Sequence, residues 1–390
     1  MNYEKLMNGT LVDMKPSGIR KFFDIAAEME DVISLSVGEP DFATPWHIRQ
    51  EGIKTLEKGR TWYSPNAGFL ALREAISGYV SRHSHVTYDP KTEVLVTVGG
   101  SKAIDLCFRS LITPGDEVLI PEPAFVCYDP LTRMAGGVPV PLVTKAEDAF
   151  RLRADVVAAA ITPKTKLLVL PYPNNPTGAI MPREDLEALA EVLRGTDVMV
   201  LSDEIYDQLV FDGKPVSTAK WWQKHPEKIA VLNGLSKAFA MPGWRVGFTL
   251  AHEDLIKQCS KLQGHMTSHI CSIAQKAGVA ALEGSYDCVD EMRQSFIRRR
   301  DMAMAEISTW PGVVCAKPAG AFYLFPDVSA LYTPEIPDST AMCTYLLEKA
   351  HVACVPGEAF GDPNCIRLSY AVADEILMDA LRRMKEALYN

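Results

Sequence analysis

The chain has 390 residues, of which 47% are apolar and 23% are charged. This is the composition of an ordinary globular protein, and it excludes disordered, collagen-like and coiled-coil chains. At 43.0 kDa the chain exceeds what one hydrophobic core usually serves, so we expect a large domain and a smaller one. The net charge is −9, from 40 basic and 49 acidic side chains. A negative protein is poorly suited to binding phosphate backbones, so we expect no nucleic acid as a partner.

The apolar stretches are short, strand-length runs, far from the ~20 residues that a bilayer-crossing helix needs, so we expect no membrane contact. Residues 1–9 mix charged and polar side chains and lack the apolar core of a secretory signal, which predicts a cytoplasmic protein. No two of the nine cysteines are closer than eleven positions. That spacing favours neither a disulfide framework nor a zinc site, and we expect no metal.

From about residue 93 to residue 250, short apolar runs alternate with longer amphipathic stretches, which predicts strands joined by crossover helices. Most of the runs are apolar at consecutive positions, as in strands buried on both faces, so the sheet should be mainly parallel and covered by helices. A covering helix is expected over 184–194, where the apolar residues follow the 3.6-residue period. The expected strands span 93–98, 117–120, 166–170, 198–201, 229–232 and 246–250.

The last third of the chain has a different pattern. A long helical pattern over 286–307 is followed by short expected strands over 321–325 and 365–371, and then by a terminal helix. This order predicts a separate, smaller α+β unit, with a boundary near Gly284. The terminal helix carries one apolar stripe, made by Leu377, Ala380, Leu381, Met384 and Leu388.

In an open parallel sheet, ligands bind beyond the carboxyl ends of the strands. The residues that directly follow four of the expected strands carry amide, carboxylate, phenol, hydroxyl and amine groups, which would then meet in one crevice. These residues are Gly99-Gly100-Ser101-Lys102, Pro173 to Gly178, Ser202 to Tyr206, and Asn233 to Lys237.

Each of these segments has an ordinary interpretation beside a chemical one. Gly99 and Gly100 suit either a plain turn or a helix start at which backbone N–H groups hold a phosphate. Lys237 is either a surface lysine or a buried amine that loses its proton and forms a Schiff base. Asp203 either caps a helix or lies opposite a pyridine nitrogen and keeps it protonated. The glycine patterns of dinucleotide sites and Walker loops do not occur in the sequence.

Several longer motifs occur together along the chain. They are Gly38-Glu39-Pro40-Asp41-Phe42, Asn175-Pro176-Thr177-Gly178, Asp203-Glu204-Ile205-Tyr206, Ser236-Lys237 with Gly243-Trp244-Arg245-Val246-Gly247, and Arg367-Leu368-Ser369-Tyr370. Through them nearly the whole chain resembles the class I pyridoxal-phosphate aminotransferases of fold type I, in the subgroup with bacterial and archaeal aspartate and aromatic aminotransferases. The resemblance implies an α/β fold, with a large cofactor-binding domain over 45–284 and a small domain from 1–44 and 285–390.

The resemblance implies pyridoxal 5′-phosphate as the cofactor. Lys237 would form the Schiff base and later move a proton between the substrate Cα and the cofactor C4′. Asp203 would pair with the pyridine nitrogen, and Phe125 would stack on the ring. Asn175 and Tyr206 would hydrogen-bond the phenolic oxygen. Lys237, Asp203 and Tyr206 are thus the expected catalytic residues. The phosphate would bind at Gly100, Ser101, Lys102, Ser236 and Arg245, with mainly backbone contacts from Ser101 and Lys102.

On the substrate side, Arg367 corresponds to the arginine that clamps the α-carboxylate with two parallel hydrogen bonds, a geometry that lysine could not supply. Gly38 would approach the same carboxylate through its backbone, together with Asn175. Tyr63 corresponds to a tyrosine that reaches the phosphate of the neighbouring subunit, which predicts a homodimer with shared active sites. The alternative for Tyr63 is an aromatic ring packed in a loop.

The implied activity is amino-group transfer between an L-amino acid and a 2-oxo acid by a ping-pong mechanism. A pyridoxal-phosphate-dependent carbon–sulfur β-lyase, or a synthase acting at Cγ, would use the same scaffold. A non-catalytic regulator would need an added DNA-binding module, and a nucleotide-dependent oxidoreductase would need the missing glycine pattern. The amino donor stays open, because Trp46, Phe360 and the segment 263–268 are side-chain-pocket candidates by resemblance alone.

Overall fold

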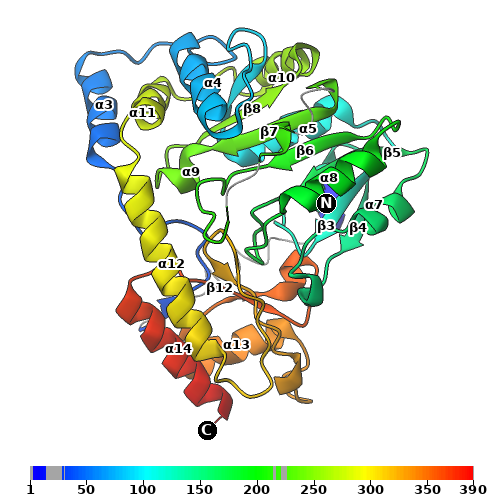
Figure 1. Ribbon diagram of the computed structural model, residues 1–390, viewed down its shortest axis with the longest axis vertical. Coiled ribbons are helices and arrows are strands. Elements are labelled where there is room, and N and C mark those ends of the chain that lie inside the picture. The colour runs from blue at the N-terminus through cyan, green and yellow to red at the C-terminus, as the bar shows by residue number, and fades with distance from the viewer. Residues whose placement is uncertain (1–2, 15–28, 30, 214–216, 221–225, 390) are drawn as a thin grey trace.

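The computed structural model describes residues 3–14, 29, 31–213, 217–220 and 226–389. Its centre is a seven-stranded sheet in the order β2-β8-β7-β6-β5-β3-β4, covered by helices (Figure 1). The strands are β2 (Val94–Val98), β3 (Glu117–Glu122), β4 (Val138–Val143), β5 (Thr165–Leu170), β6 (Met199–Asp203), β7 (Ile229–Gly234) and β8 (Val246–Ala251).

The sheet is mainly parallel, as predicted. Every pair from β4 through β3, β5 and β6 to β7 is parallel, whereas β8 runs antiparallel to both of its neighbours. All six expected strands form, within two residues of the predicted ends. Because β8 is reversed, it begins at the edge of the sheet where the parallel strands end.

Strand β4 was not among the predicted strands. Its sequence, Val-Pro-Val-Pro-Leu-Val, contains two prolines, which argue against a strand in the middle of a sheet. However, β4 is an edge strand that pairs only with β3. The backbone N–H of Val138 donates to Asp116 on the β3 side, so Pro139 and Pro141, at the alternate positions, turn their nitrogens outward. The prolines thus fall where no hydrogen bond is lost.

Helices cover both faces of the sheet, and each face has its own hydrophobic core. The predicted helix over 184–194 is α8, in which Leu186, Leu189 and Leu193 are buried and Ala190 is half-buried. The helices of this part are α3 (Trp46–Glu57), α4 (Leu70–Ser84), α5 (Gly99–Leu111), α6 (Tyr128–Met134), α7 (Ala154–Ala160), α8 (Arg183–Leu193), α9 (Leu235–Ala238), α10 (Glu253–Met266) and α11 (Ser272–Glu283).

The C-terminal part surrounds a third hydrophobic core, below the sheet in Figure 1. It contains α12 (Asp287–Ile307), α13 (Ser339–Ala350) and α14 (Asp374–Tyr389), and four short strands: β9 (Tyr323–Leu324), β10 (Val352–Ala353), β11 (Val355–Pro356) and β12 (Ile366–Ser369). The predicted stripe of α14 is buried except for Leu388, which is half-buried. The predicted α+β character is therefore confirmed.

The N-terminal segment joins this C-terminal part. Strand β1 (Ile33–Ser34) pairs in parallel with β10, and Leu35 belongs to the third core. Before it, α1 (Gly9–Asp13) has no buried residue. The part of the chain that the structure describes contains no helix long and apolar enough to span a bilayer.

Candidate active site

A cavity of about 320 Å³ opens at the edge of the sheet where β5, β6 and β7 end and β8 begins. The predicted meeting of strand-end residues therefore occurs. Residues from the N-terminal segment and from the C-terminal part close the cavity on the other side. Eleven predicted site residues line it: Gly38, Gly100, Ser101, Phe125, Asn175, Asp203, Tyr206, Ser236, Lys237, Arg245 and Arg367.

Lys237 lies in the single turn α9, directly after β7, and its half-buried amine projects into the cavity. Its Nζ donates a hydrogen bond to the backbone oxygen of Gly38 and lies 5.7 Å from the Tyr206 ring centre. Burial, followed by the positive charge of Arg367, lowers the pKa of Lys237 to about 8. Near neutral pH roughly a tenth of the amine is therefore unprotonated and nucleophilic.

Asp203 is the last residue of β6 and is buried. Its Oδ2 accepts a hydrogen bond of 2.8 Å from the Tyr128 hydroxyl, and its Oδ1 accepts one of 3.1 Å from the Ile205 N–H. Burial raises the pKa of Asp203 to about 6, and both hydrogen bonds act in the opposite direction. The bond to Ile205 is a local turn contact, because residues 205–208, just after β6, form a turn and not a helix. The cap alternative therefore does not describe this site.

Arg367 projects from β12 and is 1% exposed. Its Nη1 donates to Oδ1 of Asn175 at 2.9 Å, and its Nη2 donates to the backbone oxygen of Ser36 at 2.6 Å. Its Nε is buried without a hydrogen-bond partner, and no carboxylate among the described residues pairs with it. A buried cation without a counter-ion is costly, so this guanidinium is suited to receive an anion from a ligand.

Tyr206 and Tyr323 meet at the same side of the cavity, with their hydroxyl oxygens 2.8 Å apart. The guanidinium carbon of Arg367 lies 4.5 Å from the Tyr323 ring centre. Gly38 approaches this pair closely, since a Cβ there would lie 2.7 Å from the Tyr323 hydroxyl. Only glycine therefore allows this backbone approach without displacing Tyr323.

The opposite end of the cavity is built from tightly packed backbone. Gly99 begins α5 with φ of +73°, and a Cβ there would lie 2.5 Å from Nη2 of Arg245. A Cβ on Gly247 would lie 2.4 Å from the Gly99 carbonyl carbon. The free N–H groups at the start of α5, the Ser101 and Ser236 side chains and the Arg245 guanidinium suit a phosphate.

Two predicted site residues lie outside this cavity. The Lys102 ammonium forms an ion pair of 2.7 Å with Asp105. Only the backbone of Lys102 is then left for the contact expected with the phosphate. Tyr63 is 91% exposed, and within its own chain its ring contacts the edge of His269. That exposure does not match the packed-loop alternative. A ring so exposed is available to a second chain.

The three side-chain-pocket candidates occupy different environments. Trp46 is 58% exposed and lies outside the cavity. Gln263 is buried and donates to the backbone oxygens of Asn66 and Val96, which is a structural role. Phe360 is buried with its ring centre 5.0 Å from the Arg367 guanidinium carbon, so it supports that side chain.

Sequence reasoning missed three contributors to the site: Tyr128, Tyr323 and the Ser36 carbonyl. Tyr128 follows the predicted Phe125 by one helical turn, and the two rings meet edge to face with centres 6.2 Å apart. Tyr323 lies in the predicted strand 321–325. Both are ordinary aromatic residues in the sequence, and nothing in their neighbourhood marks their partners in space.

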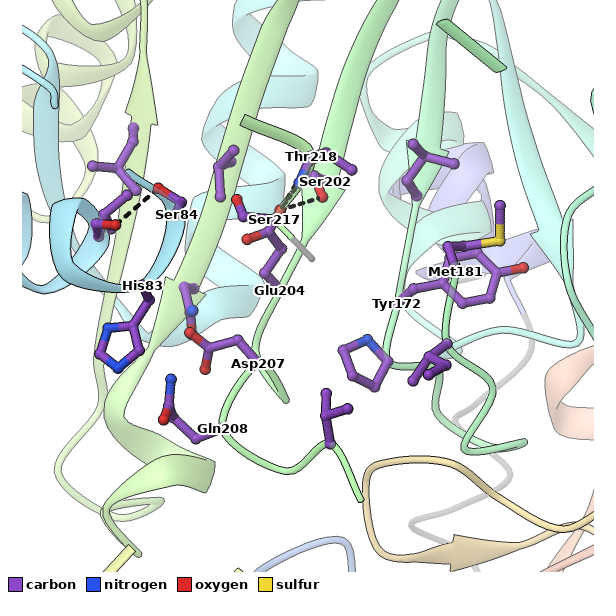
Figure 2. Close-up of a pocket in the computed structure, with 18 of the residues that line it drawn as sticks. His83, Ser84, Tyr172, Met181, Ser202, Glu204, Asp207, Gln208, Ser217 and Thr218 are labelled. Atoms are coloured by element: carbon purple, nitrogen blue, oxygen red, sulfur yellow. Dashed lines mark hydrogen bonds between the residues drawn. The ribbon is translucent and has the colours of Figure 1, made fainter. Parts of the chain in front are cut away.

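A second, smaller cavity of about 60 Å³ lies between α4 and the strand ends, beside the loop that follows β6 (Figure 2). Glu204 enters it, whereas the preceding Asp203 faces the first cavity. Oε1 of Glu204 accepts hydrogen bonds from the Ser202 hydroxyl at 2.9 Å and the Thr218 hydroxyl at 2.8 Å. Tyr79 donates to Oδ2 of Asp207. These contacts anchor the loop that carries Tyr206.

The model of the family "Aminotransferase class I and II" matches residues 30–384. The chain belongs to this aminotransferase family. The putative aminotransferase YugH of Bacillus subtilis is 43% identical over 97% of both chains. The solved structure of the Thermus thermophilus aspartate aminotransferase with maleate superposes with a TM-score of 0.93, at 37% identity over 98% of this chain and 99% of that one. A solved Pyrococcus protein, A1, also gives a TM-score of 0.93, at 40% identity over 97% and 98%.

The predicted fold type I and the predicted class of activity are thereby confirmed. This aminotransferase is pyridoxal-phosphate-dependent, and its relatives do not favour the lyase alternative. The residues of the cavity fit that cofactor: an amine with a lowered pKa for its aldehyde, a buried carboxylate for its ring nitrogen, and a glycine-rich helix start with an arginine for its phosphate.

Proposed function

We propose that this aminotransferase binds pyridoxal phosphate in the cavity around Lys237 and there exchanges amino groups between an L-amino acid and a 2-oxo acid. The observation that carries the proposal is the buried Arg367 guanidinium, which lacks an anionic partner among the described residues and lies in one cavity with Lys237 and Asp203. A carboxylate from either kind of substrate would supply the missing counter-ion.

Ten residues would hold the cofactor, five at its aldehyde carbon and around its ring and five at its phosphate. Lys237 would hold its aldehyde carbon covalently, and Asp203 would pair with its ring nitrogen. Phe125 would stack on the ring, while Asn175 and Tyr206 would hydrogen-bond its phenolic oxygen. The phosphate would bind to Arg245 and to the residues Gly100, Ser101, Lys102 and Ser236.

When bound, the cofactor supplies an electron-poor ring that stabilises negative charge at the substrate Cα. The protein then has to hold that Cα beside a base. Lys237, once released from its covalent bond, would remove and return the proton at Cα. Its Nζ already lies against the backbone oxygen of Gly38, which restricts the direction of the amine. Holding the base beside the reacting atom in this way lowers the entropic part of the barrier.

Arg367 would clamp the α-carboxylate of the substrate, with Asn175 and the Gly38 backbone beside it. The side chain of Arg367 is already fixed from two sides, by Asn175 and by the Ser36 carbonyl. A fixed guanidinium loses little conformational freedom when the carboxylate arrives. It would therefore orient every substrate in the same way, whatever its side chain.

The assembly that we propose is a homodimer in which Tyr63 reaches the phosphate site of the partner subunit. The 91% exposure of Tyr63 supports this role. We also propose a cytoplasmic location and a division into 45–284 and 1–44 with 285–390. The separate third core, which includes Leu35, and the pairing of β1 with β10 support that division.

The amino donor can be identified with a panel of amino acids against 2-oxoglutarate and pyruvate, followed by the absorbance of the bound cofactor. Relatives are named for aspartate, prephenate, aromatic and N-acetyl-LL-diaminopimelate substrates, so the panel includes these classes. We expect stoichiometric exchange of amino groups with at least one donor. Release of pyruvate and ammonia from cystathionine without any 2-oxo acid would contradict the proposal and support a lyase.

A further inference from the structure

The Asp203 carboxylate is held by two hydrogen bonds that come from different parts of the chain. The bond from the Ile205 N–H is local, and any residue at position 205 other than proline would make it. The bond from the Tyr128 hydroxyl crosses 75 positions of sequence and depends on one side chain. Tyr128 therefore gives Asp203 a hydrogen bond that the backbone around Asp203 does not supply.

Tyr128 itself is rigidly placed. It is 1% exposed and begins α6, and its backbone oxygen accepts the Thr132 hydroxyl at 2.8 Å. Its ring meets Phe125, the residue that we assign to the cofactor ring, at 84°. One turn of chain thus presents an aromatic face for the cofactor and a hydroxyl for the carboxylate opposite the ring nitrogen. Both residues line the cavity.

We propose that Tyr128 is a positioning residue for the transamination reaction, because its hydroxyl holds Asp203 in the orientation and ionised form that a protonated pyridine nitrogen requires. The inference rests on the proposed role of Asp203. An ionised carboxylate accepts the ring N–H and stabilises its positive charge, whereas a protonated carboxyl would donate its own hydrogen to the ring nitrogen and leave the ring neutral.

Burial and the Tyr128 hydrogen bond have opposite effects on the ionisation of Asp203. Burial favours the neutral acid and raises the pKa of Asp203 to about 6, whereas the Tyr128 hydrogen bond is the strongest effect in the opposite direction. The other titratable groups near Asp203 are Cys127, Tyr206 and Lys237. Burial raises the pKa values of the Tyr128 and Tyr206 phenols and of the Cys127 thiol, so these groups stay neutral, and among the described residues that act on Asp203, Lys237 is the one that adds a positive charge.

The test compares the wild-type holoenzyme with Tyr128→Phe, each loaded with pyridoxal phosphate labelled with ¹⁵N in the ring. In the wild type we expect the ¹⁵N resonance of a protonated pyridine at pH 7. In Tyr128→Phe the resonance should move toward that of a neutral pyridine, and kcat should fall about tenfold or more with KM changed less than about threefold. A protonated ring and unchanged kcat in Tyr128→Phe would overturn the inference.

Three further variants keep the result interpretable. Tyr370→Phe is the matched control, because Tyr370 is equally buried and its hydroxyl donates to Ala321 outside the cavity; its ¹⁵N resonance should stay at the wild-type position. Asp203→Asn should give a neutral ring; if it does not, the proposed role of Asp203 fails instead. If Tyr128→Phe does not fold, 4-aminophenylalanine at position 128, which has a similar shape and is a weaker hydrogen-bond donor, should move the ¹⁵N resonance at pH 7 part of the way toward that of a neutral pyridine. An unchanged resonance in that variant would equally overturn the inference.

Discussion

Two basic side chains that form no ion pair among the described residues, the half-buried Lys237 and the buried Arg367, define the chemistry of the cavity. Arg367 has no ion pair among the residues that the structure describes, and its positive charge helps to lower the pKa of Lys237 to about 8. The same guanidinium that would bind the substrate carboxylate thus also favours the neutral amine.

Lys237→Ala should abolish turnover while the fold stays intact, because the covalent hold on the cofactor and the base at Cα are lost together. Far-ultraviolet circular dichroism and the thermal midpoint should match the wild type. Lys145→Ala is the control, since Lys145 is an exposed lysine that pairs only with Glu147. Appreciable steady-state turnover by the Lys237 variant would remove this lysine from its proposed role.

The rate of covalent capture of pyridoxal phosphate by the apoprotein should depend on pH through Lys237. Only the neutral amine reacts, so the rate should rise with a midpoint near pH 8 and level off above about pH 9, whereas an unshifted lysine with a pKa of 10.5 would give a rise continuing beyond pH 10. Stopped-flow absorbance measures this rate. In Arg367→Gln a like charge is removed, so the pKa should rise and the plateau should move to higher pH. A plateau that stays in place would show that Arg367 has no such influence.

Arg367→Lys should lower kcat/KM by about thirtyfold or more for every amino donor, because an ammonium cannot form the two parallel hydrogen bonds. Steady-state kinetics with several donors measures the effect. Arg382→Lys, at an exposed position of α14, is the control. A loss confined to one class of donor would mean that Arg367 reads the side chain instead of the α-carboxylate.

At the level of elements, the reversed strand β8 brings Arg245 to the site. Because β8 is antiparallel to β2 and β7, the residue before it lies at the edge where the parallel strands end. Its second residue, Gly247, then packs against the turn between β2 and α5. The phosphate end of the site therefore depends on a close contact between two backbones.

Gly247→Ala should lower the free energy of unfolding by about 1–3 kcal/mol, because the added methyl group meets backbone atoms of Gly99 that cannot move aside. It should also weaken the binding of pyridoxal phosphate. Urea denaturation and fluorescence titration measure the two effects. Gly243→Ala is the matched control in the same segment, since a Cβ there contacts nothing within 4 Å. Equal stability of the two variants would contradict the close-contact argument.

At the level of the whole molecule, the site combines residues from all parts of the chain. Gly38 comes from the N-terminal segment, Lys237 from the single turn α9 after β7, and Arg367 from the part around the third core. The cavity is therefore complete within one chain except for the phosphate contact proposed for Tyr63. Whether Tyr63 makes that contact across a dimer can be tested.

Mixing two inactive or weakened chains should restore activity if the active sites are shared. A dimer of one Tyr63→Phe chain and one Lys237→Ala chain keeps one intact site, because Lys237 and Tyr63 then come from opposite chains. Co-expressed chains should reach roughly a quarter of wild-type specific activity, beyond the average of the separate parents. Light scattering should give twice 43.0 kDa. If the co-expressed chains show only the average activity of the two parents, Tyr63 either acts in the active site of its own chain or acts in no active site.

The local parts of this fold were predictable, and so were the residues at the strand ends. Consecutive apolar residues indicated the strands, and helical periodicity indicated α8, because both patterns follow from neighbours in the chain. Strand β4 escaped prediction because its prolines are tolerated only at an edge, and a sequence does not say which strand is the edge. Tyr128 escaped for a similar reason, since its partner Asp203 lies 75 positions away.

The amino-acid sequence by itself determined the elements, the type of sheet and the chemical groups at its carboxyl edge, since these depend on short-range patterns of polarity and on turn residues. Only the tertiary structure decided that β8 is reversed, that Arg367 meets Asn175 across 192 positions, and that Tyr128 donates to Asp203. These contacts depend on how distant segments pack against one another, and no local pattern encodes that packing.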